Sequence, residues 1–505
     1  MNSEFELIDL FKNIGSEYYE DNGIIISPGD DCAAFKSNKP IVTSIDASVA
    51  GVHFPKNAKP SDIAYRSIAV ALSDIAAMAC KPLAFSLSVT VPHNEYDWFE
   101  SFQEGTKDIS DEYKISLIGG DLTSGPLNVN VVVYGSPYSK KILTRSGAKP
   151  GDIICISSQV GKASKGLKDW NNNIDSSFID YYLRPKAKIQ LGKEISLSAN
   201  ACIDTSDGLL ADLKKMLDAS KCGADIYIDD IPITSDINDL NAGDDCAVFK
   251  SNKPIVTSID ASVEGVHFPK NANPSDIAYR SIAVALSDIA AMACRPLAFS
   301  LSVTVPHNEH DWFEGFLEGT KKISDEYRIS LIGGDLTSGP LNINVVVYGS
   351  PFSEKILTRS GAQPGDIICI SSQVGKASKG LKDWNNNIDS SFIDSYLRPK
   401  AKIELGKEIS LIANACIDTS DGLLADLKKM LHASRCGADV YIDDIPITSD
   451  INDLNAGDDY DLCFTLPEEL VADNFIKIGI VKEDKKINLF SNKGYDIDIK
   501  GYEHY

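Results

Sequence analysis

The chain has 505 residues, of which 43% are hydrophobic, a composition typical of a folded globular protein. Its formal net charge is −23, from 49 basic and 72 acidic residues, which argues against a surface for nucleic acid or anionic membrane. No apolar run reaches the roughly 20 residues of a membrane span, and the first residues lack the pattern of a secretory signal. We therefore expect a cytoplasmic protein with no nucleic-acid partner and no membrane partner.

Predicted strands and helices alternate along the chain. Strand patterns cover 41–49, 83–91 and 129–137, and apolar residues at helical spacing predict helices over 61–79 and 94–113. After a turn signal at 149–152, the pattern predicts a strand over 152–160, helical structure around 175–200 and a helix over 207–220, and further strands follow after 457. This alternation predicts an α/β or α+β fold.

A domain-scale repeat dominates this order. Residues 29–242 recur without a gap as 243–456, an offset of 243 − 29 = 214, and the two copies differ at only 19 positions. Residues 1–28 and 457–505 occur once. Each copy divides into an N-terminal and a C-terminal half, so the predicted domains are 1–140, 141–242, 243–354 and 355–505.

Acidic residues recur beside Gly, Ser or Thr at the predicted turns and strand ends. Carboxylate oxygens suit Mg²⁺, which often binds together with substrate phosphates. A single aspartate beside glycine is more often a turn or N-cap residue, so the ordered set is what indicates metal binding. Copy one has Asp30, Asp31, Asp46, Asp74, Asp121, Asp204 and Asp207, and copy two has Asp244, Asp245, Asp260, Asp288, Asp335, Asp418 and Asp421.

The ordered motifs GDDCA, IDASVEGVHF, SDIAAM, IGGD, LTRSGA, IDTSDGL, GDDYDLCFTLP and GYEHY resemble the thiamine-monophosphate kinase family of the aminoimidazole ribonucleotide synthetase superfamily. The resemblance runs over nearly the whole chain, once in each copy. It implies a two-domain protomer, here an imperfect tandem repeat, whose N-terminal halves bind ATP and metal and pair within the chain or between chains. It also implies ATP-dependent phosphorylation of thiamine monophosphate to thiamine diphosphate, with several Mg²⁺ ions.

The resemblance also implies site residues. The implied metal ligands are Asp30, Ser44, Asp46, Asp74, Asp121, Asp204 and Asp207 in copy one, and Asp244, Ser258, Asp260, Asp288, Asp335, Asp418 and Asp421 in copy two. The implied nucleotide contacts are Gly120, Asp121, Arg145, Ser206, Gly334, Asp335, Arg359 and Ser420. The implied substrate contacts are His53, His267, Asp458 and Tyr502. Three departures from the family pattern leave every carboxylate in place: Leu122 and Leu336 follow the GGD motifs, Ile45 and Ile259 precede a ligand aspartate, and Asp458 replaces the usual Glu.

The single triplet at 243–245 stands where one copy should end and the next should begin. Copy two keeps Asp458 and Tyr502, so we expect it to hold the more complete site. The C-terminal half of copy one has no equivalent of 457–505, so we expect an open sheet edge there. Two alternatives remain: another ATP-dependent member of the superfamily, or an inactive nucleotide-binding or scaffold protein. The stretch VGKASKG is not a Walker motif, because Ala163 occupies the Ser/Thr position.

Overall fold

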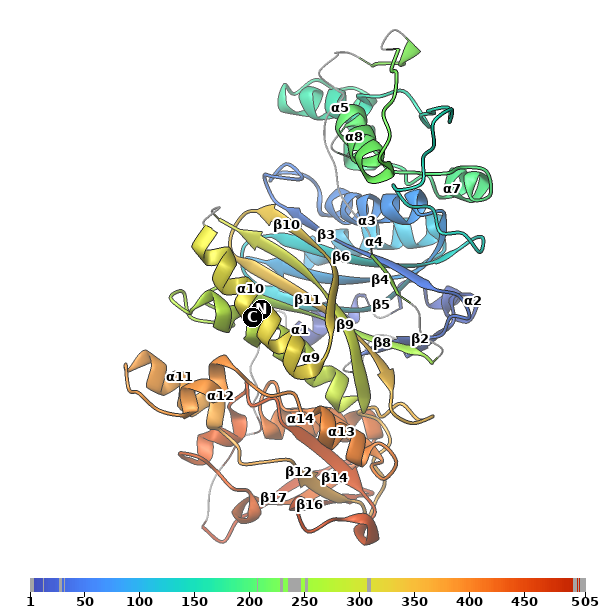
Figure 1. The fold of residues 1–505 in the computed structure, drawn as a ribbon. Coiled ribbons are helices and arrows are strands. Elements are labelled where there is room, and N and C mark those ends of the chain that lie inside the picture. The colour runs from blue at the N-terminus through green and yellow to red at the C-terminus, as the bar shows by residue number, and fades with distance from the viewer. Residues whose placement is uncertain are drawn as a thin grey trace.

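The computed structural model describes residues 4–11, 13–26, 30, 32–206, 208–227, 230–234, 247–249, 253–306, 310–493, 497 and 499. The two N-terminal halves lie together in the middle of the molecule, and the two C-terminal halves lie at opposite ends (Figure 1). Within the described ranges, none of the helices is both apolar enough and long enough for a bilayer crossing.

The N-terminal half of copy one is a five-stranded sheet in the order β5-β4-β6-β3-β7. Its strands are β3 (Ile41–Val49), β4 (Cys80–Val91), β5 (Ser116–Ser124), β6 (Asn128–Pro137) and β7 (Ala247–Phe249). Helices α3 (Pro60–Ala77) and α4 (Tyr96–Tyr113) pack on it through a shared core that includes Ile68 and Phe102. Pro60 fixes the first turn of α3 at the position where a missing N–H costs nothing. The predicted strands and helices of this half are confirmed, and β5 was not predicted.

The N-terminal half of copy two has the same plan in a six-stranded sheet, β1-β2-β8-β11-β9-β10. The strands are β1 (Ile24–Ile26), β2 (Ala33–Phe35), β8 (Ile255–Val263), β9 (Cys294–Val305), β10 (Ser330–Ser338) and β11 (Asn342–Pro351). Helices α9 (Pro274–Ala291) and α10 (His310–Tyr327) pack against it. The short helices α1 (Glu4–Asp9) and α2 (Tyr19–Asn22) precede β1.

The two copies exchange their leading strands. Strand β2 belongs to copy one but pairs antiparallel with β8 of copy two, with Ala33 opposite Thr257. In the same way β7 belongs to copy two but pairs with β3 of copy one, with Phe249 opposite Ile41. Each N-terminal sheet is therefore completed by a strand from the other copy.

The two N-terminal sheets also pack face to face. Tyr134 and Tyr348 are fully buried in one core cluster that draws residues from both copies. Each tyrosine hydroxyl bonds across the copies, Tyr134 to Thr257 at 3.2 Å and Tyr348 to Thr43 at 3.3 Å. Matching contacts at equivalent positions on both sides are what a pseudo-two-fold axis produces.

The C-terminal half of copy two contains a six-stranded sheet in the order β13-β15-β12-β16-β14-β17. Its strands are β12 (Ile367–Ile370), β13 (Ala415–Asp418), β14 (Gly437–Tyr441), β15 (Leu462–Leu466), β16 (Ile476–Lys482) and β17 (Ile487–Phe490). Its helices are α11 (Lys376–Asn385), α12 (Phe392–Leu397), α13 (Ile403–Ile409) and α14 (Leu423–Ser434). Strands β15 to β17 all come from the part of the chain that occurs once.

The C-terminal half of copy one keeps the helices and lacks the sheet. Helices α5 (Lys162–Asn171), α6 (Phe178–Leu183), α7 (Ile189–Ile195) and α8 (Leu209–Ser220) are present. Over 141–234, the residues that the structure describes form no strand. The predicted strand over 152–160 is therefore wrong for copy one, although β12 has the same sequence in copy two. The physical reason is that β12 lies between β15 and β16, and copy one has no equivalent of either.

Candidate active site

A cavity of about 1210 Å³ opens between the paired N-terminal sheets and the C-terminal half of copy two. Its lining combines predicted site residues from both copies. From copy one it takes Asp30, Gly120 and Asp121, and from copy two it takes Ser258, Asp260, Asp288, Arg359, Asp418, Ser420 and Asp421. The sequence groups these residues by copy, but the fold does not. Asp30 precedes the exchanged strand β2, and Gly120 and Asp121 lie on β5 of the facing sheet, so all three reach the cavity beside copy two.

Asp121 reaches across the copies from strand β5. Its carboxylate Oδ2 accepts a hydrogen bond from the backbone N–H of Ala261 at 2.9 Å. The mirror contact joins Asp335 Oδ2 to the backbone N–H of Ala47 at 3.0 Å. The site that includes the C-terminal half of copy two therefore uses Asp121 from the IGGD motifs, whereas Asp335 lies on the opposite side of the pseudo-axis.

The close approach of β5 to β4 requires glycine at position 120, just before Asp121. A Cβ at position 120 would lie 2.2 Å from the carbonyl oxygen of Leu87 on the neighbouring strand, which no side chain could occupy. The same holds at Gly334, where the distance to the carbonyl oxygen of Leu301 would be 2.1 Å. Glycine thus lets β5 run close beside β4 and brings Asp121 to the cavity wall.

Asp30 is held by the C-terminal half of copy two. Its Oδ1 accepts a hydrogen bond from the backbone N–H of Arg359 at 3.1 Å, and the Arg359 Nε lies 3.9 Å away. Both side chains are largely buried, at 12% and 21% exposure. Asp30 of copy one is therefore held at the cavity by the predicted nucleotide-binding arginine of copy two.

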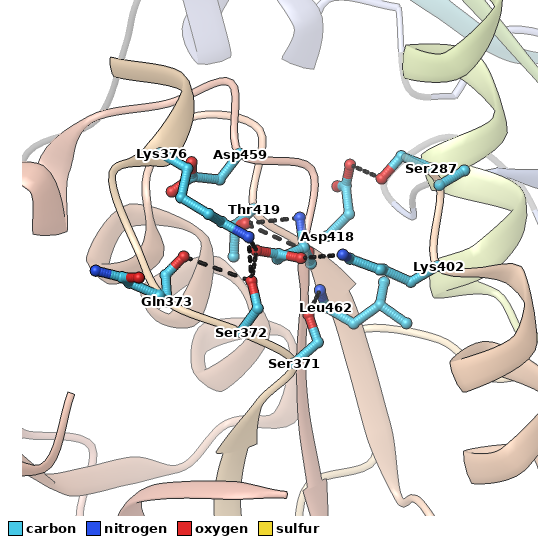
Figure 2. Close-up of polar contacts among 12 residues, drawn as sticks. Ser287, Ser371, Ser372, Gln373, Lys376, Lys402, Asp418, Thr419, Asp459 and Leu462 are labelled. Atoms are coloured by element: carbon cyan, nitrogen blue, oxygen red, sulfur yellow. Dashed lines mark hydrogen bonds and ion pairs between the residues drawn. The ribbon is translucent and has the colours of Figure 1, made fainter. Parts of the chain in front are cut away.

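Ser258, Asp260 and Asp288 form a compact oxygen cluster on β8 and α9. The Ser258 hydroxyl donates to Asp288 Oδ2 at 2.5 Å and lies 3.4 Å from Asp260 Oδ2. Copy one repeats the pair, with Ser44 donating to Asp74 Oδ2 at 2.5 Å. The residue before Asp288 on α9 is Ser287, which donates to Asp418 Oδ2 at 2.7 Å (Figure 2).

Asp421 lies in a charged network that the sequence analysis missed. Asp426 Oδ2 accepts from the backbone N–H groups of Asp421 and Gly422 at 3.0 and 3.1 Å, which shapes the loop before α14. Lys429 contacts the carboxylates of both Asp421 and Asp426. Burial raises the pKa of Asp426 to about 6, whereas the two carboxylates raise the pKa of Lys429 against the effect of burial. The signal available was spacing, since Asp426 and Lys429 lie one helical turn apart.

The two predicted histidines lie outside the lining of this cavity. His53 Nδ1 accepts the backbone N–H of Val49 at 3.0 Å, and its Nε2 lies 3.3 Å from the Thr337 hydroxyl of the other copy. His267 Nδ1 accepts the backbone N–H of Val263 at 3.0 Å. Both rings thus cap the turn after a long strand.

Asp458 also lies outside the cavity lining, next to the second of these turns. Its carboxylate pairs with the guanidinium of Arg280, which is 2% exposed and which also donates to the carbonyl oxygen of His267. The Tyr460 hydroxyl donates to the same carboxylate at 3.1 Å. The predicted substrate residues His267 and Asp458 are therefore joined through one buried arginine.

The equivalent group in copy one is less complete within the described residues. Ser44, Asp46, Asp74, Arg145, Asp204 and Ser206 are described, with Gly334 and Asp335 from copy two. Burial raises the pKa of Asp204 to about 6, and the Ser206 backbone N–H donates to Asp212 at 3.1 Å. Asp207, Asp244 and Tyr502 lie outside the described residues.

The donor set of the cavity fits magnesium. The six carboxylates and the Ser258 hydroxyl implied as metal ligands offer only oxygen atoms, and the lining also contains Cys32 and His432, which are not among the implied ligands. Hard oxygen donors are what Mg²⁺ binds. The cavity also has Arg359, Lys428 and Lys429 in its lining, which suit the phosphate groups of a nucleotide.

Comparisons with known proteins show which family the chain is similar to. The family model described as AIR synthase related protein, N-terminal domain, matches residues 29–136 and 243–350. A thiamine-monophosphate kinase from Buchnera aphidicola subsp. Schizaphis graminum is 38% identical over 295 residues, which cover 52% of this chain and 91% of the relative. The Escherichia coli K12 thiamine-monophosphate kinase is 33% identical over 299 residues, covering 53% and 92%. A crystal structure of the Stenotrophomonas maltophilia K279a enzyme has 32% identity and a TM-score of 0.46, covering 50% of this chain and 90% of that chain.

Proposed function

The chain belongs to the thiamine-monophosphate kinase family. We propose that the cavity is the active site, where the protein transfers the γ-phosphoryl group of ATP to thiamine monophosphate. The product is thiamine diphosphate. The observation that carries the proposal is the meeting of Asp30 and Asp121 from copy one with Asp260, Asp288, Asp418 and Asp421 from copy two around one cavity.

The chemistry of the acceptor requires no general base. A phosphate monoester is largely a dianion near pH 7, because its second pKa is about 6. It is already a nucleophile, so the obstacle is its repulsion by the triphosphate. The catalytic task of the protein is to position the two phosphate groups and to neutralise their charge.

The side chains of the cavity suit that task. Mg²⁺ held by Asp30, Asp121, Asp260 and Asp288 would neutralise phosphate charge when bound. Arg359 presents a guanidinium for bidentate contact with phosphate oxygens. Lys429 forms an ion pair with Asp421, so the negative charge of this carboxylate is neutralised before any ligand binds.

We assign the working site to the C-terminal half of copy two, which has its complete sheet. In copy one, Arg145, Asp204 and Ser206 belong to a half without strands in its described part. The N-terminal halves then act together as a pseudo-dimer within one chain. The exchanged strands β2 and β7 and the buried tyrosine contacts between the sheets support this pairing.

A steady-state assay with ATP, Mg²⁺ and thiamine monophosphate tests the proposal. The matched pair of variants is Asp260→Asn and Asp46→Asn, because these residues occupy the same position in the two copies. We expect Asp260→Asn to reduce thiamine diphosphate formation by roughly a hundredfold or more, and Asp46→Asn to leave most of it. Equal losses would contradict the assignment to one site. A chain that binds ATP and forms no thiamine diphosphate would favour the scaffold alternative.

A further inference from the structure

In copy two, the sheet of the C-terminal half is completed by the tail, residues 459–490. Strand β12 pairs with β15 on one side and β16 on the other, and β14 pairs with β16 and β17. Under this cover Ile367 and Ile368 are 8% and 0% exposed. Residues 459–490 thus supply half of the sheet.

The same sequence in copy one is open. Ile153 and Ile154, the equivalents of Ile367 and Ile368, are 88% and 40% exposed. Tyr227 is 72% exposed, against 38% for Tyr441 in copy two. Apolar side chains at this exposure, beside backbone without strand partners, form a surface that a β-segment can join.

The open half nevertheless keeps the local geometry of the covered one. The Asn200 side-chain amide donates to Asp152 at 3.0 Å, as Asn414 donates to Asp366 at 3.0 Å. The backbone contacts match as well, because Val160 N–H to Pro232 O and Val374 N–H to Pro446 O are both 2.9 Å. The acceptor surface is therefore preformed in copy one.

A buried carboxylate anchors the tail to copy two. Asp461, the residue before β15, lies 2.9 Å from Lys402 Nζ and 3.3 Å from Lys376 Nζ. Its backbone N–H donates to the Thr419 hydroxyl at 3.1 Å, and its carboxylate accepts from Ser372. Figure 2 shows Lys376, Lys402, Ser372 and Thr419 converging on this point between α11 and β13. Although burial opposes it, the two lysines hold the pKa of Asp461 below its usual range.

Copy one has the equivalents of all four residues that contact Asp461, but it has no equivalent of Asp461 itself. The equivalents, 214 positions earlier, are Ser158, Lys162, Lys188 and Thr205. Position 461 − 214 = 247 is Ala247, which lies in β7 within the N-terminal sheet of copy one. Among the described residues, neither Lys162 nor Lys188 has a carboxylate partner.

We propose that the C-terminal half of copy one is a binding site for a β-forming polypeptide segment equivalent to residues 459–490, supplied by another molecule. Residues 1–505 hold two acceptor halves and one such segment, and that segment pairs with copy two. Main-chain pairing with 153–156 gives affinity, and an aspartate at the position of Asp461 gives specificity through Lys162 and Lys188.

A binding experiment on the full chain tests this, with a labelled peptide of residues 457–493 as the probe. We expect one peptide per chain, together with hydrogen-exchange protection of 153–156 that appears when the peptide is added. Tyr181 stands where copy two has Ser395, so proteolytic fragments that run from 153 to 181 or from 367 to 395 distinguish the two copies by mass. Protection appearing only at 367–370 would show exchange with the tail of copy two and would overturn the proposal.

Two variants distinguish specific binding of the peptide from non-specific binding. An Asp461→Asn peptide should bind about tenfold more weakly or worse, because a hydrogen bond to a charged partner is lost. The chain variant Lys162→Ala/Lys188→Ala should lose the same factor with the original peptide and lose nothing further with the Asn peptide. Equal binding of both peptides to the original chain would overturn the role of the lysines. Protection of 153–156 without any peptide would show that the surface is already covered.

Discussion

The carboxylate of Asp121, in copy one, accepts a hydrogen bond from the backbone N–H of Ala261, in copy two, at 2.9 Å. This contact places one acid of the first copy in the site of the second. A residue of copy one therefore lines the cavity beside the C-terminal half of copy two, and its twin Asp335 makes the mirror contact with Ala47.

The first prediction follows from this contact between Asp121 of copy one and Ala261 of copy two. Asp121→Asn should abolish thiamine diphosphate formation, with a loss of roughly a hundredfold or more in kcat, because the cavity of copy two loses a charged oxygen ligand. Asp335→Asn should retain most of the activity. Steady-state assays of the two variants, at matched Mg²⁺ and ATP, make the comparison. A loss with Asp335→Asn alone would mean that each site draws its acids from its own copy.

The second prediction concerns two cysteines of identical local sequence. Cys155 is exposed in the open half, whereas Cys369 is buried in β12, where burial raises the pKa of its thiol to about 12. Only the thiolate reacts with alkylating reagents, so Cys155 should be labelled by iodoacetamide well before Cys369. Mass spectrometry of fragments that run from Cys155 to Tyr181 or from Cys369 to Ser395 measures each rate separately. Equal slow labelling would show that 152–160 is covered in solution.

The sequence predicted most elements of the N-terminal halves, because the strands at 41–49 and 129–137 and the helix at 61–79 carry strong local patterns. It could not predict which strand pairs with which. Strands β3 and β8 share the sequence IVTSIDASV, so nothing local tells β2 which of them to join. Sequential strands usually pair, yet β2 bypasses β3, only a few residues away, for β8.

The same limit applies to the site. The acidic motifs identify the residue types, but their grouping depends on strand pairing between distant parts of the chain. Residues 152–160 show a different limit. They keep the sequence pattern of a strand but form none, because copy one has no equivalents of the partner strands β15 and β16. Side-chain periodicity reports which face is buried, whereas a strand exists only when another strand binds it.

The third prediction tests what Asp458 does. Asp458→Asn removes the charge beside Arg280, which is buried at 2% exposure, so we expect about 1–2 kcal/mol loss of unfolding free energy. The left-handed backbone at Asp458, with φ of 73°, is one that Asn accepts. Urea unfolding of the full chain measures the change. Combining Asp458→Asn with Arg280→Met should recover part of it, because the uncompensated charge is removed as well. A raised KM for thiamine monophosphate with unchanged stability would instead identify Asp458 as a substrate contact.

The fourth prediction is a pH dependence that comes from His53. Burial, with a smaller contribution from Arg66, lowers the pKa of His53 below 6.5, and its Nδ1 already accepts the Val49 N–H. Below pH 6.5 the unfolded chain therefore binds a proton that the folded chain resists, so stability falls as pH decreases and is constant above that value. Urea midpoints at pH 7.5 and 5.5 measure this fall, which His53→Gln should reduce. An undiminished fall in His53→Gln would assign the pH dependence to other groups.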